Sequence, residues 1–62
     1  MKLTEVESRV FKKLIEELAE LSLELIHALN KPKKENVKEI LEEISDVKKY
    51  INSLEDLINE RV

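Results

Sequence analysis

The sequence predicts an all-α fold, a hairpin of two antiparallel helices, on the basis of three observations. Glycine is absent from the 62 residues, and the only proline, Pro32, lies near the middle of the chain. Apolar residues recur every three or four positions on both sides of that proline, as they do on helices that bury one face. A short turn between two such helices makes them antiparallel neighbours.

The first helix is expected over about residues 4–29. Thr4 followed by Glu7 matches a capping box, in which each side chain bonds to the backbone N–H of the other residue. Asn30 would end the helix in the left-handed conformation that glycine often adopts there. The apolar residues are predicted to form two adjacent seams. The first is Phe11, Leu14, Leu18, Leu21 and Leu25, and the second is Ile15, Ala19, Ser22, Ile26 and Leu29.

The turn is expected over residues 30–35, and the second helix over about residues 36–60. Pro32 suits the first turn of a helix, and Asn36 followed by Glu39 offers a second capping signal. Its apolar face repeats at three- and four-residue spacing, which is typical of helix bundles. The residues of this face are Val37, Ile40, Ile44, Val47, Ile51, Leu54 and Ile58. Residues 1–62 are therefore expected to form one helical hairpin domain.

Self-association is predicted, because one hairpin cannot cover both seams of the first helix. A chain of this length is marginally stable alone, and the absence of cysteine excludes disulfides. A contiguous exposed apolar patch marks an interface. We expect a homo-oligomer in which two hairpins form a four-helix bundle, as a dimer or possibly within a tetramer.

The composition excludes several classes of partner. Charged residues make up 40% of the chain, with a net charge of −3 and the two signs interspersed, so no nucleic acid partner is expected. The one basic cluster, Lys31, Lys33 and Lys34, fits a solvated turn, with a phosphate-attracting rim as the alternative. No apolar run approaches the roughly 18 residues of a membrane span, and no signal-peptide core is present. A cytoplasmic location without membrane association is the default expectation.

Two acidic motifs suggest a chemical function. Glu16-Glu17-x-x-Glu20 and Glu43-x-x-Asp46 are separated by the 22 residues 21–42. Carboxylates three positions apart share a helix face, and antiparallel pairing brings these two mid-helix motifs to a similar height. Half-buried carboxylates crowded together take up a proton or bind a cation. Oxygen-only ligands favour Mg²⁺, with Mn²⁺ possible, over zinc. A solvated acidic face is the alternative, because such pairs arise readily in a chain with 14 acidic residues.

Segments 16–29 and 39–54 together resemble the MazG-like all-α nucleoside triphosphate pyrophosphohydrolases. The signature of that family is EExxE, a spacer of variable length and ExxD, often followed by an aromatic residue one turn later. Glu16, Glu17 and Glu20 match the first part, Glu43 and Asp46 match the second, and Tyr50 matches the aromatic residue. The resemblance covers residues 11–58, which is most of the chain.

The resemblance implies Mg²⁺-dependent hydrolysis of an NTP or dNTP to the monophosphate and pyrophosphate, in nucleotide-pool housekeeping. The implied metal ligands are Glu17, Glu20, Glu43 and Asp46. The implied catalytic residues are Glu16, which would bind a further ion or orient the attacking water, and Glu20. Tyr50 would contact the substrate. Members of the family carry additional helices with base-stacking aromatic residues, whereas this chain has only Phe11 and Tyr50. The alternative is therefore a non-catalytic oligomerisation or adaptor module that retains only the fold.

Overall fold

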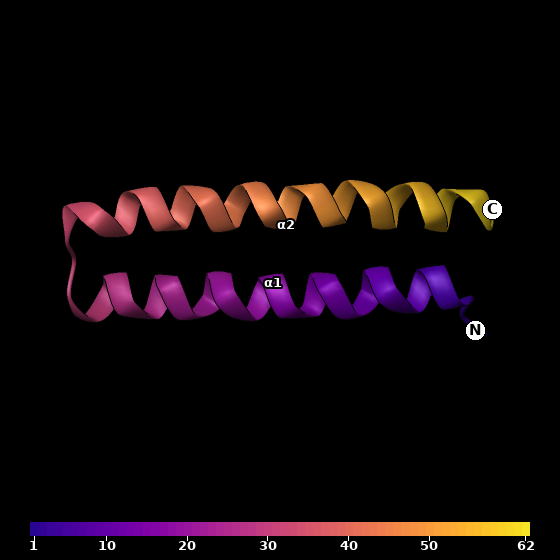
Figure 1. Ribbon diagram of the computed structural model, residues 1–62, viewed down its shortest axis with the longest axis horizontal. Helices are drawn as coiled ribbons and strands as arrows, with labels where there is room; N and C mark the ends of the chain where they lie inside the picture. The colour runs from indigo at the N-terminus through magenta and orange to yellow at the C-terminus, as the bar shows by residue number, and fades with distance from the viewer.

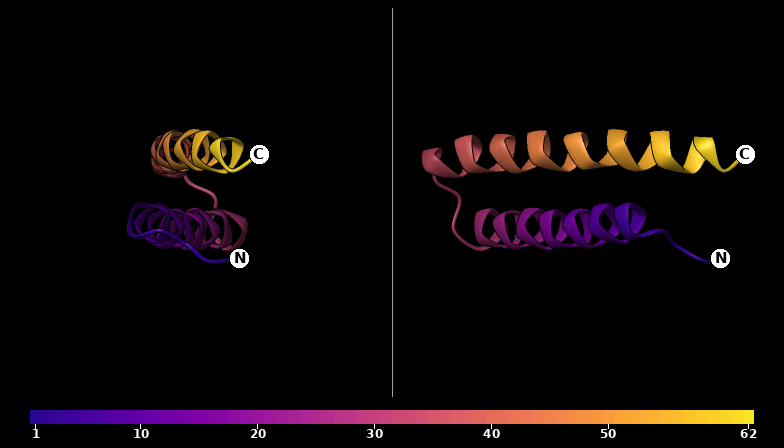
Figure 2. Two further views of the ribbon diagram at one scale, coloured as in Figure 1. Left: turned by 90° about the vertical axis from the view of Figure 1, so that its right-hand side faces the viewer. Right: turned by 45° about the vertical axis from the view of Figure 1, so that its right-hand side comes forward.

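The computed structural model describes residues 1–62 as two long helices that lie side by side (Figure 1). Helix α1 spans Glu5–Asn30, and helix α2 spans Lys34–Glu60. They run antiparallel, so the two termini lie together at one end and the turn closes the other (Figure 2). The molecule measures 43 × 15 × 15 Å. The predicted all-α hairpin is confirmed, and neither helix is long and apolar enough to cross a membrane.

Helix α1 begins as predicted but ends differently. The Glu7 backbone N–H donates to Thr4 Oγ1 at 3.1 Å, and the Thr4 N–H donates to Glu7 Oε1 at 2.8 Å, which completes the capping box. No residue has a positive φ, so the prediction of a left-handed Asn30 was wrong. Instead Lys31 caps the helix with φ −149°. Pro32 explains this ending, because a proline disfavours helical backbone in the residue before it.

Helix α2 begins at Lys34, within two residues of the expected start at about residue 36. Its N-cap is Lys33, which forms no side-chain capping bond, and Pro32 lies before it in the turn. Asn36 is therefore inside the first helical turn, and the predicted Asn36 cap was wrong. Its Nδ2 donates to the Lys31 carbonyl at 3.4 Å instead. The amide thus ties the start of α2 to the end of α1.

The helices pack along one seam whose residues alternate at three- and four-residue spacing. Such a heptad pattern keeps a single stripe of each helix against its partner. In α1 the seam is Glu7, Val10, Leu14, Glu17, Leu21, Glu24 and Ala28. In α2 it is Asn36, Ile40, Glu43, Val47, Tyr50, Leu54 and Leu57. All are buried or half-buried, yet Leu14 and Val47, at 8% and 6% exposure, are the only apolar residues that count as buried.

This seam corrects the predicted packing. Leu14 and Leu21 lie in it as expected, whereas Leu18 is 43% exposed and Leu25 is 50% exposed. In α2, Ile40, Val47 and Leu54 were predicted correctly, but Val37 and Ile51 are exposed. A helix can bury only one stripe against a single partner. Here that stripe includes carboxylates, which displaces several leucines and isoleucines to its side.

The displaced apolar residues gather on one face of the hairpin. In both helices they occupy positions that directly follow seam residues, and these positions fall on the same side of an antiparallel pair. This apolar face comprises Phe11, Leu18, Leu25, Val37, Ile44, Ile51 and Ile58. The positions that directly precede seam residues form the opposite, polar face, which comprises Lys13, Glu20, His27, Glu39, Asp46 and Ser53. The hairpin therefore has one apolar face and one polar face on opposite sides of the seam.

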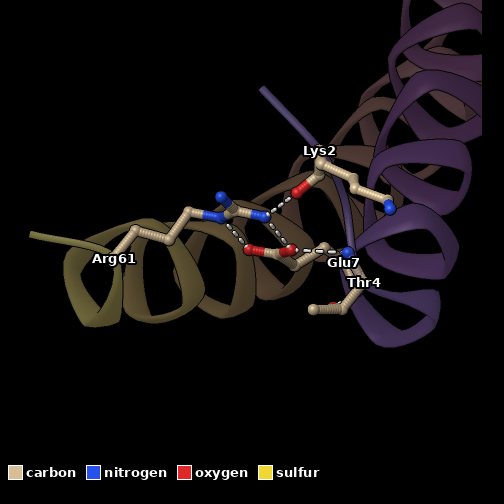
Figure 3. A network of polar contacts seen from close by, with 4 residues as sticks. All are labelled: Lys2, Thr4, Glu7 and Arg61. Carbon is tan, nitrogen blue, oxygen red and sulfur yellow. Dashed lines mark hydrogen bonds and ion pairs between the residues drawn. The ribbon is translucent and has the colours of Figure 1, made fainter.

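An ion pair closes the open end of the hairpin (Figure 3). Arg61 Nε and Nη2 donate to the two carboxylate oxygens of Glu7, and Nη2 also donates to the Lys2 carbonyl. Glu7 is only 4% exposed. The Arg61 hydrogen bond and then the Thr4 backbone N–H lower the pKa of Glu7 to about 2. Sequence analysis assigned Glu7 to the capping box alone, because a partner 54 residues away leaves no local signal.

We expect the Glu7–Arg61 pair to make the hairpin acid-sensitive. Because the pKa of Glu7 is lowered on folding, its contribution is present above pH about 4.5 and is lost as the pH falls toward 2. The thermal midpoint of the wild type should therefore fall between pH 5 and pH 2 more steeply than that of Glu7→Gln. The variant should also melt lower at pH 7. Glu5→Gln, which removes the exposed Glu5–Arg9 pair, is the control and should melt like the wild type. Parallel pH profiles for Glu7→Gln and wild type would contradict this role.

Candidate metal centre

Three carboxylates of the two acidic motifs meet across the middle of the hairpin, and that of Glu20 lies beside them. We call Glu17, Glu20, Glu43 and Asp46 the acidic tetrad. Glu17 and Glu43 are seam residues and half-buried, whereas Glu20 and Asp46 lie three positions later, exposed on the polar face. Each helix thus contributes one inner and one outer carboxylate, because residues three apart share a helix face.

The geometry of the tetrad is compact. One carboxylate oxygen from each of Glu17, Glu43 and Asp46 lies within 4.8 Å of the other two. Glu20 is the fourth neighbour, since its charge raises the pKa of both Glu17 and Glu43. Antiparallel pairing of the two helices was expected to make the motifs converge at mid-helix. A single hairpin is sufficient for that convergence.

Burial makes the charged state of this cluster unfavourable. It is the first cause that raises the pKa of Glu43 to about 7, and the charge of Glu20 is the next. Burial also raises the pKa of Glu17, again with Glu20 adding to the effect. Desolvation and neighbouring like charges both disfavour an ionised carboxyl. Without a metal, the carboxyls of Glu17 and Glu43 therefore keep their protons to a higher pH than isolated carboxyls do.

Two oxygens of the tetrad lack partners. Oε2 of Glu17 and Oε2 of Glu43 are buried and accept no hydrogen bond. Neither oxygen takes part in an ion pair, because the three ion pairs of the chain are Glu5–Arg9, Glu16–Lys13 and Glu7–Arg61. Buried acceptors are almost always satisfied in proteins, so a water molecule, a shared proton or a cation is the kind of partner that these two oxygens can take.

The donor set fits a hard divalent cation. Mg²⁺ binds oxygen at about 2.1 Å in an octahedron, which places its ligand oxygens roughly 3 to 4 Å apart. The spacing within 4.8 Å lies close to that range. Glu17 and Glu43 would hold the ion from the seam, and Glu20 and Asp46 from the polar face. The absence of cysteine and the exposed position of His27 make zinc a poor match.

The remaining predicted site residues lie beside the tetrad. Glu16 is exposed and pairs with Lys13 at 3.6 Å, and it contributes no oxygen to the converging group. Tyr50 is half-buried in the seam one turn after Asp46, with Lys49 Nζ 5.4 Å from its ring centroid. Both residues border the site without forming part of the carboxylate cluster.

Lys13 is a further neighbour of the site, and it belongs to neither of the two acidic motifs. Its pKa is raised by Glu16 first, and the charges of Tyr50 and Glu17 add to the effect. Its ammonium therefore lies near both the tetrad and Tyr50. The available signal was the heptad spacing, since Lys13 lies seven residues before Glu20 and occupies the same polar-face position one heptad earlier.

Comparison with known proteins does not identify the chain. No protein-family model, no curated protein and no solved structure matches it. The assignment of a function therefore depends on the tetrad, on its neighbours and on the spacing of the two motifs.

The raised pKa of Glu43 predicts an unusual dependence of stability on pH. Its folded-state pKa of about 7 exceeds the ordinary 4.5, so its favourable contribution is complete below pH 4.5 and is lost as the pH rises through 7. In metal-free solution the thermal midpoint of the wild type should fall from pH 5 to pH 8. Glu43→Gln should remove most of that fall and should melt higher than the wild type at pH 8. Glu55→Gln, at an exposed position outside the tetrad, is the matched control. A wild-type midpoint that stays constant over this range would contradict the prediction.

Proposed function

We propose that this protein is a MazG-like, Mg²⁺-dependent nucleoside triphosphate pyrophosphohydrolase. It would convert NTPs or dNTPs to monophosphates and pyrophosphate, as a cytoplasmic housekeeping enzyme of the nucleotide pool. The observation that supports this best is the tetrad, with two buried oxygens that accept no hydrogen bond and form no ion pair within the chain. The same four residues are the metal ligands that the resemblance implies.

Each residue around the tetrad has a chemical role in this proposal. Mg²⁺ held there would neutralise negative charge on the phosphates and lower the pKa of a bound water. Glu20, on the open polar face, is placed to accept a proton from the attacking water, and Glu16 would help to orient that water. Lys13 adds a positive charge beside the carboxylates, where it would attract phosphate oxygens. Tyr50 offers a phenol hydrogen bond to the substrate.

We also propose that two copies pair through their apolar faces to form a four-helix bundle. A lone hairpin leaves these side chains in water, with Val37 at 60% and Ile51 at 44% exposure, while only two apolar residues are buried. A two-fold axis places the same face of each copy against the other, so a self-complementary apolar surface is covered on both chains. The tetrad lies at the seam and polar face and stays open to substrate. A tetramer would require further contacts between dimers, outside these apolar faces.

A non-catalytic oligomerisation or adaptor module is the second candidate, and the exposed apolar face favours it. Such a module would use that face for binding and would leave the acidic residues as a solvated surface. It predicts neither pyrophosphate release nor stabilisation by Mg²⁺. It also predicts only small stability changes on substitution of the tetrad.

Pyrophosphate release from a panel of NTPs and dNTPs tests the proposed enzyme. We expect release with Mg²⁺ or Mn²⁺ and none in EDTA. Mg²⁺ should also raise the thermal midpoint, because a ligand that binds only the folded state stabilises it. If no triphosphate is hydrolysed and Mg²⁺ leaves the midpoint unchanged, the adaptor module is the better description.

A further inference from the structure

A second polar site lies at the turn end of the hairpin, beside the tetrad. It is a pocket of about 330 Å³ without a single hydrophobic lining residue. Its lining comes from the end of α1, the turn and the start of α2, which Figure 2 shows meeting at the closed end. This volume lies within the range of small-molecule sites in proteins. The polar lining indicates a ligand that is recognised mainly by hydrogen bonds.

The pocket continues the polar surface of the tetrad. Glu24, in its wall, lies four residues after Glu20, and Glu39 lies four residues before Glu43. Four helical residues rise about 6 Å, so one turn separates the two sites on both helices. A ligand that binds the tetrad at one end can therefore extend along the polar surface and place its adjoining group in the pocket.

The wall nearest the tetrad suits hydroxyl groups rather than phosphate. Glu24 and Glu39 face each other there, and a hydrogen bond with Glu24 is the first cause that raises the pKa of Glu39. Carboxylates repel phosphate but accept hydrogen bonds from sugar hydroxyls, as the acidic residue of dinucleotide-binding folds does with ribose. Lys31 and Lys33 also line the pocket, and both are exposed to solvent.

The far wall suits a heterocyclic base. Asn30 presents an amide with two N–H donors and an acceptor, and Asn36 keeps one free N–H and its acceptor. These groups match the polar edge of a base. One Asn36 N–H already donates to the Lys31 carbonyl, which fixes the orientation of that amide. His27 adds a planar ring of the kind on which unstacked bases stack.

We propose that this turn pocket binds the ribose and base of the nucleotide whose α-phosphate lies at the tetrad. Glu24 and Glu39 contact the ribose hydroxyls, and His27, Asn30 and Asn36 contact the base. The inference rests on the proposed function and adds a selectivity to it. A deoxyribose leaves a polar group of the Glu24–Glu39 pair unpaired, so ribonucleotides are preferred over deoxyribonucleotides.

Binding of the reaction product tests the pocket without turnover. AMP and 2′-deoxy-AMP are titrated into the ¹⁵N-labelled full chain with Mg²⁺ and followed by NMR. AMP should shift the side-chain amide signals of Asn30 and Asn36, and 2′-deoxy-AMP should bind about tenfold more weakly. Glu39→Ala should remove most of this difference, whereas Glu35→Ala, an exposed residue of α2 outside the pocket, should preserve it.

Hydrolysis assays separate this inference from the proposed function. Glu39→Ala should raise the KM for ATP about tenfold and leave kcat nearly unchanged. If the chain releases pyrophosphate but AMP does not shift the amide signals of Asn30 and Asn36, the nucleoside pocket is wrong and the proposed enzyme activity stands. A chain that releases no pyrophosphate would overturn the enzyme, while the AMP titration would still decide the pocket. Inorganic pyrophosphate that shifts the pocket amides as strongly as AMP does would show a phosphate site and overturn the nucleoside assignment.

Discussion

Replacement of Glu43 by glutamine is expected to abolish Mg²⁺-dependent pyrophosphate release. The amide keeps the size of the side chain but removes the charge that would hold a divalent cation from the seam, where Oε2 of Glu43 lacks any other partner. We expect rates at least about 100-fold below wild type for Glu43→Gln, and similar losses for Glu20→Gln and Asp46→Asn. The measurement is the initial rate of pyrophosphate release at saturating Mg²⁺ and NTP.

The thermal stability of Glu43→Gln separates a loss of activity from unfolding. A catalytic defect is often confused with unfolding, but Glu43→Gln should melt higher than the wild type at pH 8 without metal, because it relieves crowding in the tetrad. A variant that is more stable and inactive identifies Glu43 as a functional carboxylate. Glu55→Gln makes the same chemical change at an exposed position and should keep wild-type activity. Activity that survives all three tetrad substitutions would refute the proposed enzyme.

The parts of the fold that depend on neighbours in sequence could be predicted. The hairpin follows from apolar spacing and from a lone proline, and the Thr4–Glu7 capping box follows from residues three apart. The convergence of Glu17 with Glu43 follows from the same reasoning, since each motif lies at mid-helix in an antiparallel pair. In each case the local pattern limits the three-dimensional outcome to one arrangement.

The missed features depend on contacts between distant segments. Apolar spacing shows that a helix has a buried face, but the choice of seam among adjacent stripes depends on the partner helix. Leu18 was therefore expected inside, and Glu24 is there instead. The Glu7–Arg61 pair and the turn pocket arise from the same inter-helix register. The end of α1 differs from the expected Asn30 cap for a different reason, since Pro32 disfavours helical backbone at Lys31 and the helix ends there.

Replacement of Leu18 by glutamate is expected to prevent self-association. Leu18 lies in the middle of the apolar face, and a carboxylate there would have to be desolvated twice at a two-fold interface, once in each copy. We expect the wild type to sediment as a dimer or larger oligomer at micromolar concentration. Leu18→Glu should sediment as a monomer with a lower thermal midpoint that no longer depends on protein concentration.

Leu23 provides the matched control for this substitution. It is 50% exposed, close to the 43% of Leu18, but it lies on the back of α1 and outside the apolar face. Leu23→Glu adds the same charge to the same helix, so it should remain an oligomer. Equal effects of the two substitutions would indicate general charge repulsion rather than an interface.

Because the tetrad forms within one hairpin, Leu18→Glu also shows whether Mg²⁺ binding requires the bundle. We expect a folded monomer to retain stabilisation by Mg²⁺, since all four carboxylates come from the same chain.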